Sequence, residues 1–385
     1  MNVRDARPEE IEDWDARVVD EPGGHVYQSR AWAEHRRASG WQPRFLIADD
    51  GGRSLALTRP WPLTGGGSGY VPRGPAPIGP DPAALGGRLV AIGEALAGEG
   101  IDVVAADAEV PAADDAFRTT IEAAGFHAIE EIQPSRHRVS LPLAGRIEDE
   151  VFAGISKSTR QRIRKAEETV DAVVRHDART GSDGPGEGFV APTEASEAAL
   201  DRFYDLLLET GERRHFSFGP RAGFVSWWSA ALAAGHLVYL EAWAGEAATA
   251  PTAPGAPDAP GEAGALGAPL AGLILYRHGG RLSTVHSGDH ADTRSTHPGA
   301  LHLLRWRAIQ LAIREGCTEM DLGGVDVAGA RGEPQEGDPL YGLYQHKTSF
   351  GGHWLELTGA HERVYDPRGY RVGRIASRFA RLVGR

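Results

Sequence analysis

A helix followed by an apolar strand occurs twice in this chain of 385 residues, and this repetition limits the fold more than any other feature. Residues 91–96 (AIGEAL) precede a strand that reaches Asp107, and residues 308–313 (AIQLAI) precede one that reaches Asp321. Two copies of one α/β unit would explain both the repetition and a length that suits two domains rather than one. A chance likeness between two amphipathic helices is the alternative.

Further elements of each half follow the same α/β order. In the first half we predict elements at 23–41 (helix), 45–48 and 54–59 (paired strands), 83–99 (helix), 101–106 (strand) and 112–124 (helix). In the second half we predict them at 238–243 and 270–276 (paired strands), 299–315 (helix) and 317–322 (strand). The glycine-rich segment 64–69 lacks the Gly-Lys-Ser/Thr ending of a phosphate-binding loop, so we interpret it as a linker.

One segment of the second half has a composition that does not favour folding. Residues 244–268 consist mainly of Ala, Pro and Gly, and such a segment cannot bury enough apolar surface to offset the entropy of the chain. We predict a disordered hairpin tip without a chemical role at 244–268, and a shorter loop of the same type at 181–188.

The sequence also argues against several classes of protein. The chain begins at Met1 without the apolar segment of a signal peptide, and no apolar run approaches the roughly 18 residues of a membrane-spanning helix. We therefore expect a cytoplasmic protein. Cys317 is the single cysteine, so neither a disulfide nor a cysteine-based metal site is expected within the chain.

The charge is unevenly distributed. A formal net charge of -12 disfavours general nucleic-acid binding, and DNA is not an expected partner. Residues 156–165 nevertheless hold five basic residues and no acidic one, and residues 366–385 hold six arginines and one aspartate. Such patches could bind phosphates on an otherwise acidic body, although two solvated helix faces would give the same pattern.

The C-terminal segment has the pattern of an amphipathic helix. Arginines form one stripe, at positions 371, 374, 378, 381 and 385, and a second stripe is apolar, at positions 372, 375, 379 and 382. We expect the apolar stripe to pack on the body of the protein. The arginine stripe would then face a polyanion, either tRNA or the anionic lipid headgroups of the inner membrane face.

Six short motifs occur in a specific order over about 330 residues. They are 27–32 (YQSRAW) with Arg36, 158–167 (STRQRIRKAE), 210–216 (TGERRHF), 298–306 (PGALHLLRW), 321–324 (DLGG) and 343–352 (LYQHKTSFGG). The last two motifs are the most specific. In this order the motifs resemble the FemABX family of tRNA-dependent aminoacyltransferases. No long helical arm is visible in the second half, so the chain resembles the armless branch of that family.

The resemblance implies an α/β (α+β) fold of two tandem GNAT-like domains, which are domains like those of acyl-CoA N-acyltransferases. The first domain would span 1–142 and be completed by 359–385, and the second would span 143–358. The implied reaction moves an amino acid from an aminoacyl-tRNA to an amine on the stem peptide of a nucleotide-linked or lipid-linked muropeptide, a peptidoglycan precursor. The aminoacyl-tRNA is a co-substrate, and no further cofactor is implied.

The same resemblance assigns roles to individual residues. Lys347 matches the lysine beside the reacting carbonyl and is the expected catalytic residue. Arg36 stands where a lysine of the first domain binds the precursor's diphosphate, and its planar guanidinium is a suitable replacement. Arg213, with Arg214 and Arg221 as competitors, is expected to bind the same diphosphate.

The remaining candidates have weaker assignments. His346 stands where a Phe often precedes the lysine, and Gly323 and Gly324 would either let the backbone approach a substrate or form a turn. The candidates for tRNA binding are Arg160, Arg162, Arg164 and Lys165. No metal site is expected, because the possible ligands in the segment 286–290 (HSGDH) lack an established spacing.

Aminoacyl transfer requires stabilisation of the oxyanion that forms at the ester carbonyl, and a fixed ammonium group such as that of Lys347 would provide it. Asp107 and Asp321 are candidate bases for the attacking amine. An aspartate at a strand end commonly makes turn hydrogen bonds instead, and we favour that interpretation for both. Proton transfer assisted by the substrate remains open.

Three alternative functions compete with this prediction. An acyl-CoA-dependent N-acyltransferase would need a glycine-rich loop whose amides bind the CoA pyrophosphate at a helix N-terminus. The segment 295–300 (STHPGA) has a single glycine and a proline in that position, so we favour tRNA as the donor. The others are aminoacyl transfer onto a small peptide and a non-catalytic scaffold at the membrane.

Overall fold

The computed structural model describes most of the chain, namely residues 1–62, 65–76, 79, 81–133, 136–179, 187–192, 194–214, 218–244, 269–325 and 332–383. The insertion predicted at 244–268 and the loop predicted at 181–188 lie almost entirely outside these residues. Within the described residues, no helix is both long enough and apolar enough to cross a membrane.

The first domain is built on a seven-stranded sheet with the order β1-β2-β3-β4-β5-β15-β6. Its strands are β1 (Val3–Asp5), β2 (Gln42–Ala48), β3 (Arg53–Pro60), β4 (Gly67–Val71), β5 (Val103–Ala106), β6 (His127–Ala128) and β15 (His361–Val364). The neighbours β4 and β5 are parallel, and helix α4 (Pro82–Gly98) connects them. Strand β15, from the last part of the chain, lies between β5 and β6.

The second domain is built on an eight-stranded sheet with the order β14-β7-β13-β12-β11-β10-β8-β9. Its strands are β7 (His137–Pro142), β8 (Ala172–His176), β9 (Glu187–Val190), β10 (Leu237–Trp243), β11 (Ala271–His278), β12 (Arg281–Asp289), β13 (Glu319–Asp321) and β14 (His353–Glu356). Here β12 and β13 are the parallel pair, and helix α11 (Ala300–Arg314) connects them. Each predicted repeat therefore forms a helix and a strand that is parallel to its neighbour.

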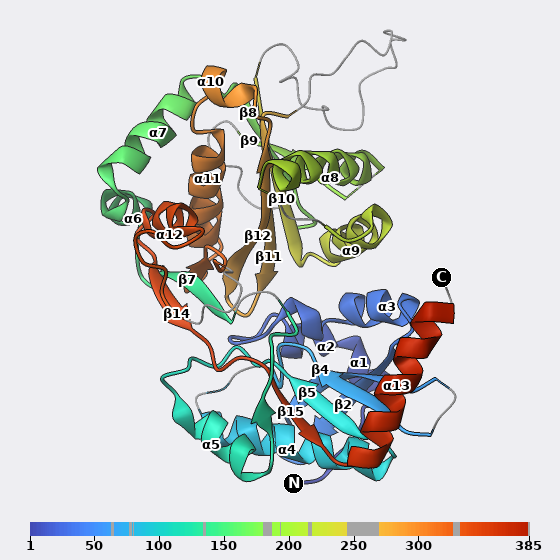
Figure 1. Ribbon diagram of the computed structural model, residues 1–385. Helices are drawn as coiled ribbons and strands as arrows, with labels where there is room; N and C mark the ends of the chain where they lie inside the picture. Colours follow the sequence, from blue (N-terminus) through green and yellow to red (C-terminus); the bar gives the residue numbers. More distant parts are fainter. Residues whose placement is uncertain are drawn as a thin grey trace.

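Helices cover the two domains (Figure 1). Those of the first domain are α1 (Pro8–Glu12), α2 (Trp14–Val18), the 3-10 helix η1 (Val26–Gln28), α3 (Arg30–Ala38), α4, α5 (Asp115–Ala123) and α13 (Pro367–Val383). Those of the second domain are α6 (Glu148–Gly154), α7 (Lys157–Glu167), α8 (Glu194–Arg214), α9 (Arg221–Ala233), α10 (Thr293–Thr296), α11 and α12 (Tyr341–Thr348).

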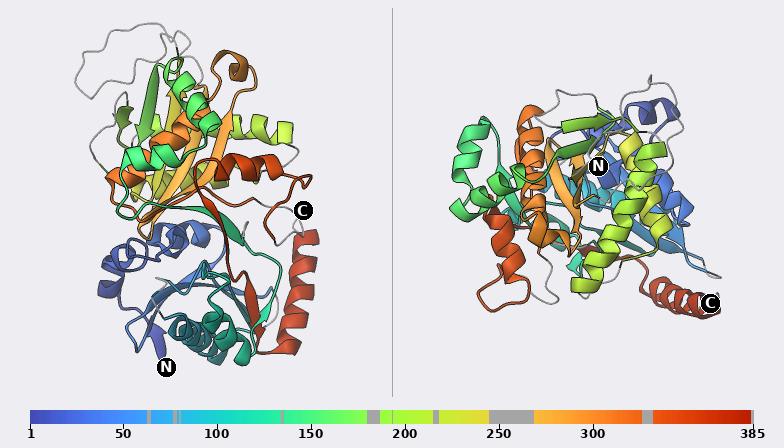
Figure 2. Two further views of the ribbon diagram at one scale, coloured as in Figure 1. Left: turned by 90° about the vertical axis from the view of Figure 1, so that its left-hand side faces the viewer. Right: turned by 90° about the horizontal axis from the view of Figure 1, so that it is seen from above.

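Side chains that alternate along β10 build two cores. Val238 and Leu240 pack in the core that includes α7 and α11, whereas Leu237 and Tyr239 pack in the core that includes α8 and α9. The latter core continues into the first domain, where the rings of Trp32 and Trp227 lie 4.8 Å apart. The two domains therefore share an apolar interface on the α9 side of the second sheet (Figures 1 and 2).

Several predicted boundaries and elements differ from the structure. The first helix begins later than predicted, at Arg30, because the Ser29 hydroxyl accepts a hydrogen bond from the Trp32 amide and caps it. The predicted linker 64–69 contains the start of β4, a central strand. The predicted domain boundary at 142 also falls too late, because β7 already pairs with β13 and β14 of the second sheet.

The C-terminal helix α13 forms as predicted, but it does not pack on the body through Val372 and Ile375, the two residues of its apolar stripe whose side chains the structure describes. It packs instead through Gly373, where the ring of Trp61 leaves no room for a Cβ atom. Val372 and Ile375 remain 51% and 55% exposed. Both views of Figure 2 show α13 along the side of the first domain.

Candidate active site

A gap between the parallel strands of the second sheet forms the centre of the candidate site. β12 and β13 pair only from Arg281 to Ser283, after which β12 continues to Asp289 without β13 beside it. A register shift between β11 and β12 leaves Val285 as a bulge directly after this point. Residues 283–287 and Asp289 therefore line an open space instead of pairing with another strand.

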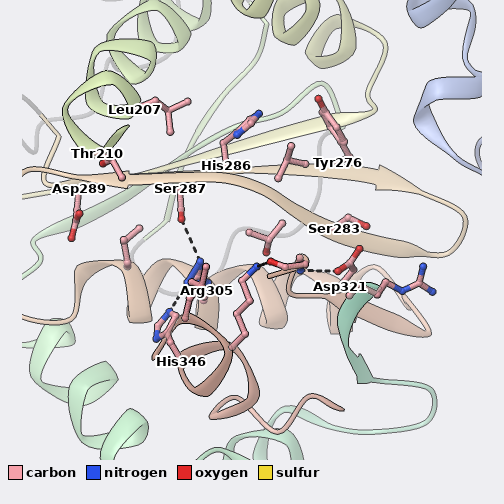
Figure 3. A pocket seen from close by; sticks show the side chains of 18 of the residues that line it. Leu207, Thr210, Tyr276, Ser283, His286, Ser287, Asp289, Arg305, Asp321 and His346 are labelled. Carbon is pink, nitrogen blue, oxygen red and sulfur yellow. Dashed lines mark hydrogen bonds between the residues drawn. The ribbon is translucent and has the colours of Figure 1, made fainter. Parts of the chain in front are cut away.

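This space belongs to a cavity of about 1720 Å³ that reaches both domains. The second domain supplies most of its wall, from β12, α11, α12 and the segment after β13 (Figure 3). The first domain supplies His25, Tyr27, Trp32, His35, Arg73 and Glu109. A cavity of this size can hold more than one drug-sized molecule, which suits a reaction between two substrates.

Lys347 lies in the wall of this cavity and is only 7% exposed. Its ammonium Nζ donates a hydrogen bond to the Gly324 carbonyl oxygen at 2.5 Å. Gly323 has a φ of 81°, and a Cβ atom there would lie 2.8 Å from the Lys347 Nζ. Gly323 therefore serves both a tight turn and the close approach of the lysine.

A buried arginine that the sequence analysis did not identify binds His346, the residue before Lys347. Arg305 of α11 donates from Nη1 to the His346 Nε2 at 2.6 Å and from Nη2 to the Ser287 Oγ at 3.3 Å (Figure 3). Burial, followed by the charge of Arg305, lowers the pKa of His346 to about 2. The imidazole is therefore neutral, and its Nε2 accepts the hydrogen bond.

A cluster of charges lies where the two domains meet. The Glu109 carboxylate accepts a hydrogen bond from Arg281 and one from Arg138 at 3.1 Å, and Arg73 lies 3.8 Å away. Burial alone would raise the pKa of Glu109, but the charges of Arg281, His25, Arg138 and Arg73 hold it well below its ordinary value. Glu109 therefore stays ionised and links arginines of both domains.

The two candidate bases occupy different environments. Asp107 accepts hydrogen bonds from the Arg73 amide at 2.6 Å and the Tyr70 hydroxyl at 2.9 Å, and it does not line the cavity. Asp321 lines the cavity, and its Oδ1 accepts a hydrogen bond from the Gly323 amide at 2.7 Å. Burial raises the pKa of Asp321. Only Asp321 is thus placed to exchange a proton with a substrate.

Three of the arginines considered for binding a diphosphate, Arg36, Arg213 and Arg221, do not line the cavity. The guanidinium of Arg36 lies over the rings of Trp32 and Trp41, at 5.4 and 5.5 Å from their centroids. Arg213 binds Glu209 at 2.6 Å and Asp289 at 3.0 Å. Among the competitors, Arg221 pairs with aspartates of α8, and the side chain of Arg214 lies outside the described residues.

The four basic residues of α7 have different surroundings. The guanidinium of Arg160 donates to the Ala153 and Ile155 carbonyl oxygens, so it joins α6 to α7. Arg164 lies over the Phe152 ring, and Lys165 pairs with Glu168. Arg162 alone among the four lines the cavity, where its Nη1 lies 3.4 Å from the His302 Nε2.

The segment 286–290, interpreted as a loop from its sequence, is the end of β12 and the residue after it. His286 is buried against Trp228, whereas His290 binds Glu209 at 2.5 Å. In the described part of the chain, no three His, Cys, Asp or Glu side chains gather as a metal site would require.

The functional residues missed by sequence reasoning are the polar side chains of β12 and Arg305. Residues 282–287 (LSTVHS) alternate only weakly between apolar and polar types, because one face of the strand lines a cavity instead of a core. The signal for Arg305 was present: an arginine stands among the apolar residues of α11, on the buried face of the helix.

Comparisons with known proteins agree with this architecture. A family model described as the acetyltransferase (GNAT) domain matches residues 262–341, a range that contains β11, β12 and α11. The crystal structure of FemX, at 17% sequence identity, covers 97% of this chain and 99% of its own with a TM-score of 0.72. A conserved protein of unknown function from Bacteroides thetaiotaomicron, at 12% identity, covers 94% of this chain and 98% of its own with a TM-score of 0.51.

No curated protein matches the chain. At these identities the likeness establishes the fold, so the prediction of two tandem GNAT-like domains is confirmed. The resemblance to the FemABX family holds at the level of the fold, over nearly the whole chain. The acetyltransferase model supports the expectation of an acyltransferase.

Proposed function

We propose that this protein is an aminoacyltransferase that moves an amino acid from an aminoacyl-tRNA to an amine of a peptidoglycan precursor. The observation that carries the proposal is the position of Lys347, a buried ammonium group at the open end of the β12–β13 gap, in a cavity large enough for two substrates. The FemX-like fold and the acetyltransferase model support the same class of reaction.

In the proposed reaction the acceptor amine attacks the ester carbonyl carbon of the aminoacyl-tRNA. A C–N bond forms, the carbonyl oxygen becomes an oxyanion, and the bond to the ribose oxygen then breaks. The ammonium of Lys347, itself buried, stabilises the oxyanion or the departing ribose oxygen, and such an interaction contributes about 3 kcal/mol. The amide product forms without a covalent enzyme intermediate, because the ester is already activated.

The attacking amine must lose a proton, and we assign Asp321 as the group that accepts it. Its carboxylate lines the cavity and accepts a hydrogen bond from the amide of Gly323, the turn that the Lys347 ammonium also approaches. The departing ribose oxygen can take up the same proton, so the transfer leaves the enzyme in its starting state. A base with a raised pKa is better matched to this exchange than an ordinary carboxylate.

The start of α11 favours a tRNA donor over CoA. Pro298 has no amide hydrogen, and a Cβ atom at Gly299 would lie 2.6 Å from the Arg162 carbonyl oxygen of α7. The α7 backbone thus crowds the helix end where a pyrophosphate would need free amides. An acyl-CoA donor remains the second candidate, since the matching family model is that of an acetyltransferase.

The acceptor carries a diphosphate, which we place near the first domain. Arg36 keeps its proposed role there, because its guanidinium is half-buried against aromatic rings and its Nε has no hydrogen-bond partner in the described part of the chain. Arg213 is a weaker choice, since binding a diphosphate would require it to leave Asp289 and Glu209.

A direct test mixes purified protein, a pool of charged tRNAs and a nucleotide-linked muropeptide. We expect the mass of the muropeptide to increase by one amino-acid residue, and the Lys347→Met variant to lose this activity. A mass gain with acetyl-CoA in the absence of tRNA would support the second candidate instead. If a small free peptide accepts the amino acid more efficiently than the muropeptide, the proposed acceptor is wrong and the small peptide replaces it.

We also propose that α13 binds the anionic surface of the cytoplasmic membrane, where lipid-linked precursors are found. Val372 and Ile375 are exposed on this helix, and Arg371, Arg374 and Arg378 lie beside them. Exposed apolar residues flanked by arginines are typical of helices that lie in a membrane interface. Sedimentation with phosphatidylglycerol vesicles should remove the wild-type protein from solution, whereas the Ile375→Glu variant should stay in solution. Equal sedimentation of the wild type and the variant would refute membrane binding through α13.

A further inference from the structure

Arg305 differs from every other buried arginine in the described residues. Arg73, Arg138, Arg175, Arg277 and Arg281 each lie within 4.0 Å of a carboxylate oxygen. Arg305 is 3% exposed, and its hydrogen bonds to the residues that the structure describes go to His346 and Ser287, which are both neutral. Its Nε has no partner among the described residues.

A buried guanidinium without an anion is costly, because it has lost water and gained no opposite charge. The loss of water lowers the pKa of Arg305 to about 10, a value at which the group remains charged near neutral pH. The carboxylate that acts on it is that of Asp289, which Arg213 and Arg294 already bind at 3.0 and 2.7 Å. The fold therefore maintains a positive charge that its own residues do not neutralise.

This charge faces the cavity. Figure 3 shows Arg305 between Ser287 of β12 and His346 of α12, with its guanidinium toward the open space. Arg162 lines the same part of the wall, and burial, followed by the charges of Arg162 and Arg305, lowers the pKa of His302 to about 4. Two neutral imidazoles thus position the arginines without cancelling their charge.

We propose that Arg305, with Arg162 beside it, forms a subsite for a phosphate group of a substrate. This inference rests on the proposed function and names the part of the donor that the site recognises. Lys347 directly follows His346, so the ester beside Lys347 and the phosphate beside Arg305 lie close together. In an aminoacyl-tRNA, the phosphodiester on the terminal ribose likewise lies close to the aminoacyl ester, so this phosphate fits the subsite. The diphosphate of the acceptor is the other phosphate group that could occupy it.

The test measures binding, so it does not depend on turnover. The probes are a 3′-aminoacylamino-3′-deoxyadenosine, with and without a 5′-phosphate, and a UDP-linked muropeptide compared with the sugar-peptide that lacks the diphosphate. Calorimetry compares the wild type, Arg305→Met and Arg307→Met. Arg307 is a matched control, because it lies on the same helix but binds Gln310 and Glu167 and does not line the cavity.

We expect the 5′-phosphate to tighten binding of the nucleoside at least tenfold in the wild type and in Arg307→Met. In Arg305→Met this preference should disappear, while the nucleoside without phosphate binds as before. If Arg305→Met loses only the preference for the UDP-linked muropeptide, the subsite still binds phosphate, but it binds the diphosphate of the acceptor instead of the phosphate of the donor. If Arg305→Met lowers neither preference, the inference is wrong, whether or not the protein transfers amino acids.

Thermal unfolding separates a binding role from a structural one. Removal of an unneutralised buried charge should leave the midpoint of Arg305→Met unchanged or raise it. Inorganic pyrophosphate at millimolar concentration should raise the midpoint of the wild type and of Arg307→Met but not that of Arg305→Met. A midpoint several degrees lower for Arg305→Met, together with an unchanged response to pyrophosphate, would show that Arg305 is structural. If pyrophosphate shifts only the proteins with Arg305 but no transfer occurs, the subsite stands and the proposed function fails.

Discussion

The two domains use the same parallel strand pair in opposite ways. In the first domain β4 and β5 stay paired to their ends, from Ser68 with Val103 to Val71 with Ala106. Asp107, directly after β5, then accepts hydrogen bonds at the end of β4, from the Tyr70 hydroxyl and the Arg73 amide. In the second domain the pairing stops at Asp321, whose Oδ1 accepts a hydrogen bond from the amide of Gly323 in its own segment. We call the parallel pair of the first domain closed, because its strands stay joined at their ends, and that of the second domain open, because β12 continues without β13 beside it.

This difference shows how one supersecondary unit can give a scaffold in one domain and a site in the other. The open pair exposes the polar residues of β12 and admits Lys347 beside Gly323. The closed pair gives the cavity no residue from β4 or β5. The first domain contributes residues from its loops, from η1 and from α3, such as Glu109, Tyr27 and Trp32, to the wall of this cavity.

The largest effect should come from the charge cluster that joins the two halves. Glu109→Gln leaves the buried Arg281 without its carboxylate partner, and an uncompensated buried charge typically costs about 3–5 kcal/mol. Glu34→Gln instead removes an exposed pair with Arg37 and should cost about 0.5 kcal/mol or less. Chemical denaturation measures both. Similar values for the two variants would mean that the domains do not depend on this cluster.

The same cluster predicts a loss of stability in acid. The folded-state pKa of Glu109 lies well below the ordinary value of 4.5. Its contribution to stability is therefore complete above about pH 4.5 and is lost as the pH falls through the lower, folded-state pKa. Glu109→Gln should weaken this acid sensitivity, which denaturation curves at several pH values would reveal.

The next effect concerns catalysis in the open domain. Lys347→Met should lower kcat on the order of 10²–10³-fold, because an ammonium that stabilises the oxyanion contributes about 3 kcal/mol. Lys165→Met is the control, since Lys165 forms an exposed pair with Glu168. Steady-state kinetics with a charged tRNA would measure both, and a Lys347 variant as active as the control would contradict the mechanism.

The two aspartates test the comparison directly. Asp321→Asn should lower kcat about 10²-fold, whereas Asp107→Asn should mainly lower stability, by about 1–3 kcal/mol, because it disturbs buried hydrogen bonds. Since burial raises the pKa of Asp321 and the base must be ionised, the activity of the wild type should rise with pH through a value above the ordinary 3.8. Asp321→Asn should lose this limb of the pH profile, and equal kinetic effects of both substitutions would refute the assignment.

The smallest predicted effect concerns two glycines with positive φ, one in each domain. Gly100→Ala, with a φ of 94° and open space around it, should cost about 1 kcal/mol of backbone strain. Gly323→Ala adds a Cβ atom 2.8 Å from the Lys347 Nζ and 3.0 Å from the Thr284 carbonyl oxygen, so it should also lower kcat. If both variants keep full activity, the approach of Lys347 to this turn is not required.

The fold was predictable because its repeats and strong elements carry local signals. The helix predicted at 299–315 and the paired strands at 238–243 and 270–276 lie within one or two residues of α11, β10 and β11. β4 was missed because Gly67 and Gly69 suggest a linker. In the structure a Cβ atom at Gly67 would lie 2.8 Å from the Arg59 carbonyl oxygen, so close packing of the strand requires glycine there.

The site was less predictable than the fold. The motifs pointed to Lys347, which reaches the cavity, but also to Arg213, which carboxylates hold elsewhere. Sequence cannot show which arginine of many lacks a carboxylate neighbour, because the neighbours of Arg305 come from β12 and α12. The predicted packing of Val372 and Ile375 of α13 was wrong for a related reason: amphipathic periodicity identifies a face of a helix, but not the surface that covers this face.

The position of β15 has a consequence for how the protein is made. This strand completes the first sheet between β5 and β6, although it is encoded more than 200 residues after β6. During synthesis on the ribosome, the sheet of the first domain therefore stays incomplete between β5 and β6 until the second domain has been synthesised. A nascent chain that stops before residue 361 would lack the strand between β5 and β6, and a fragment without it would expose an unpaired strand edge.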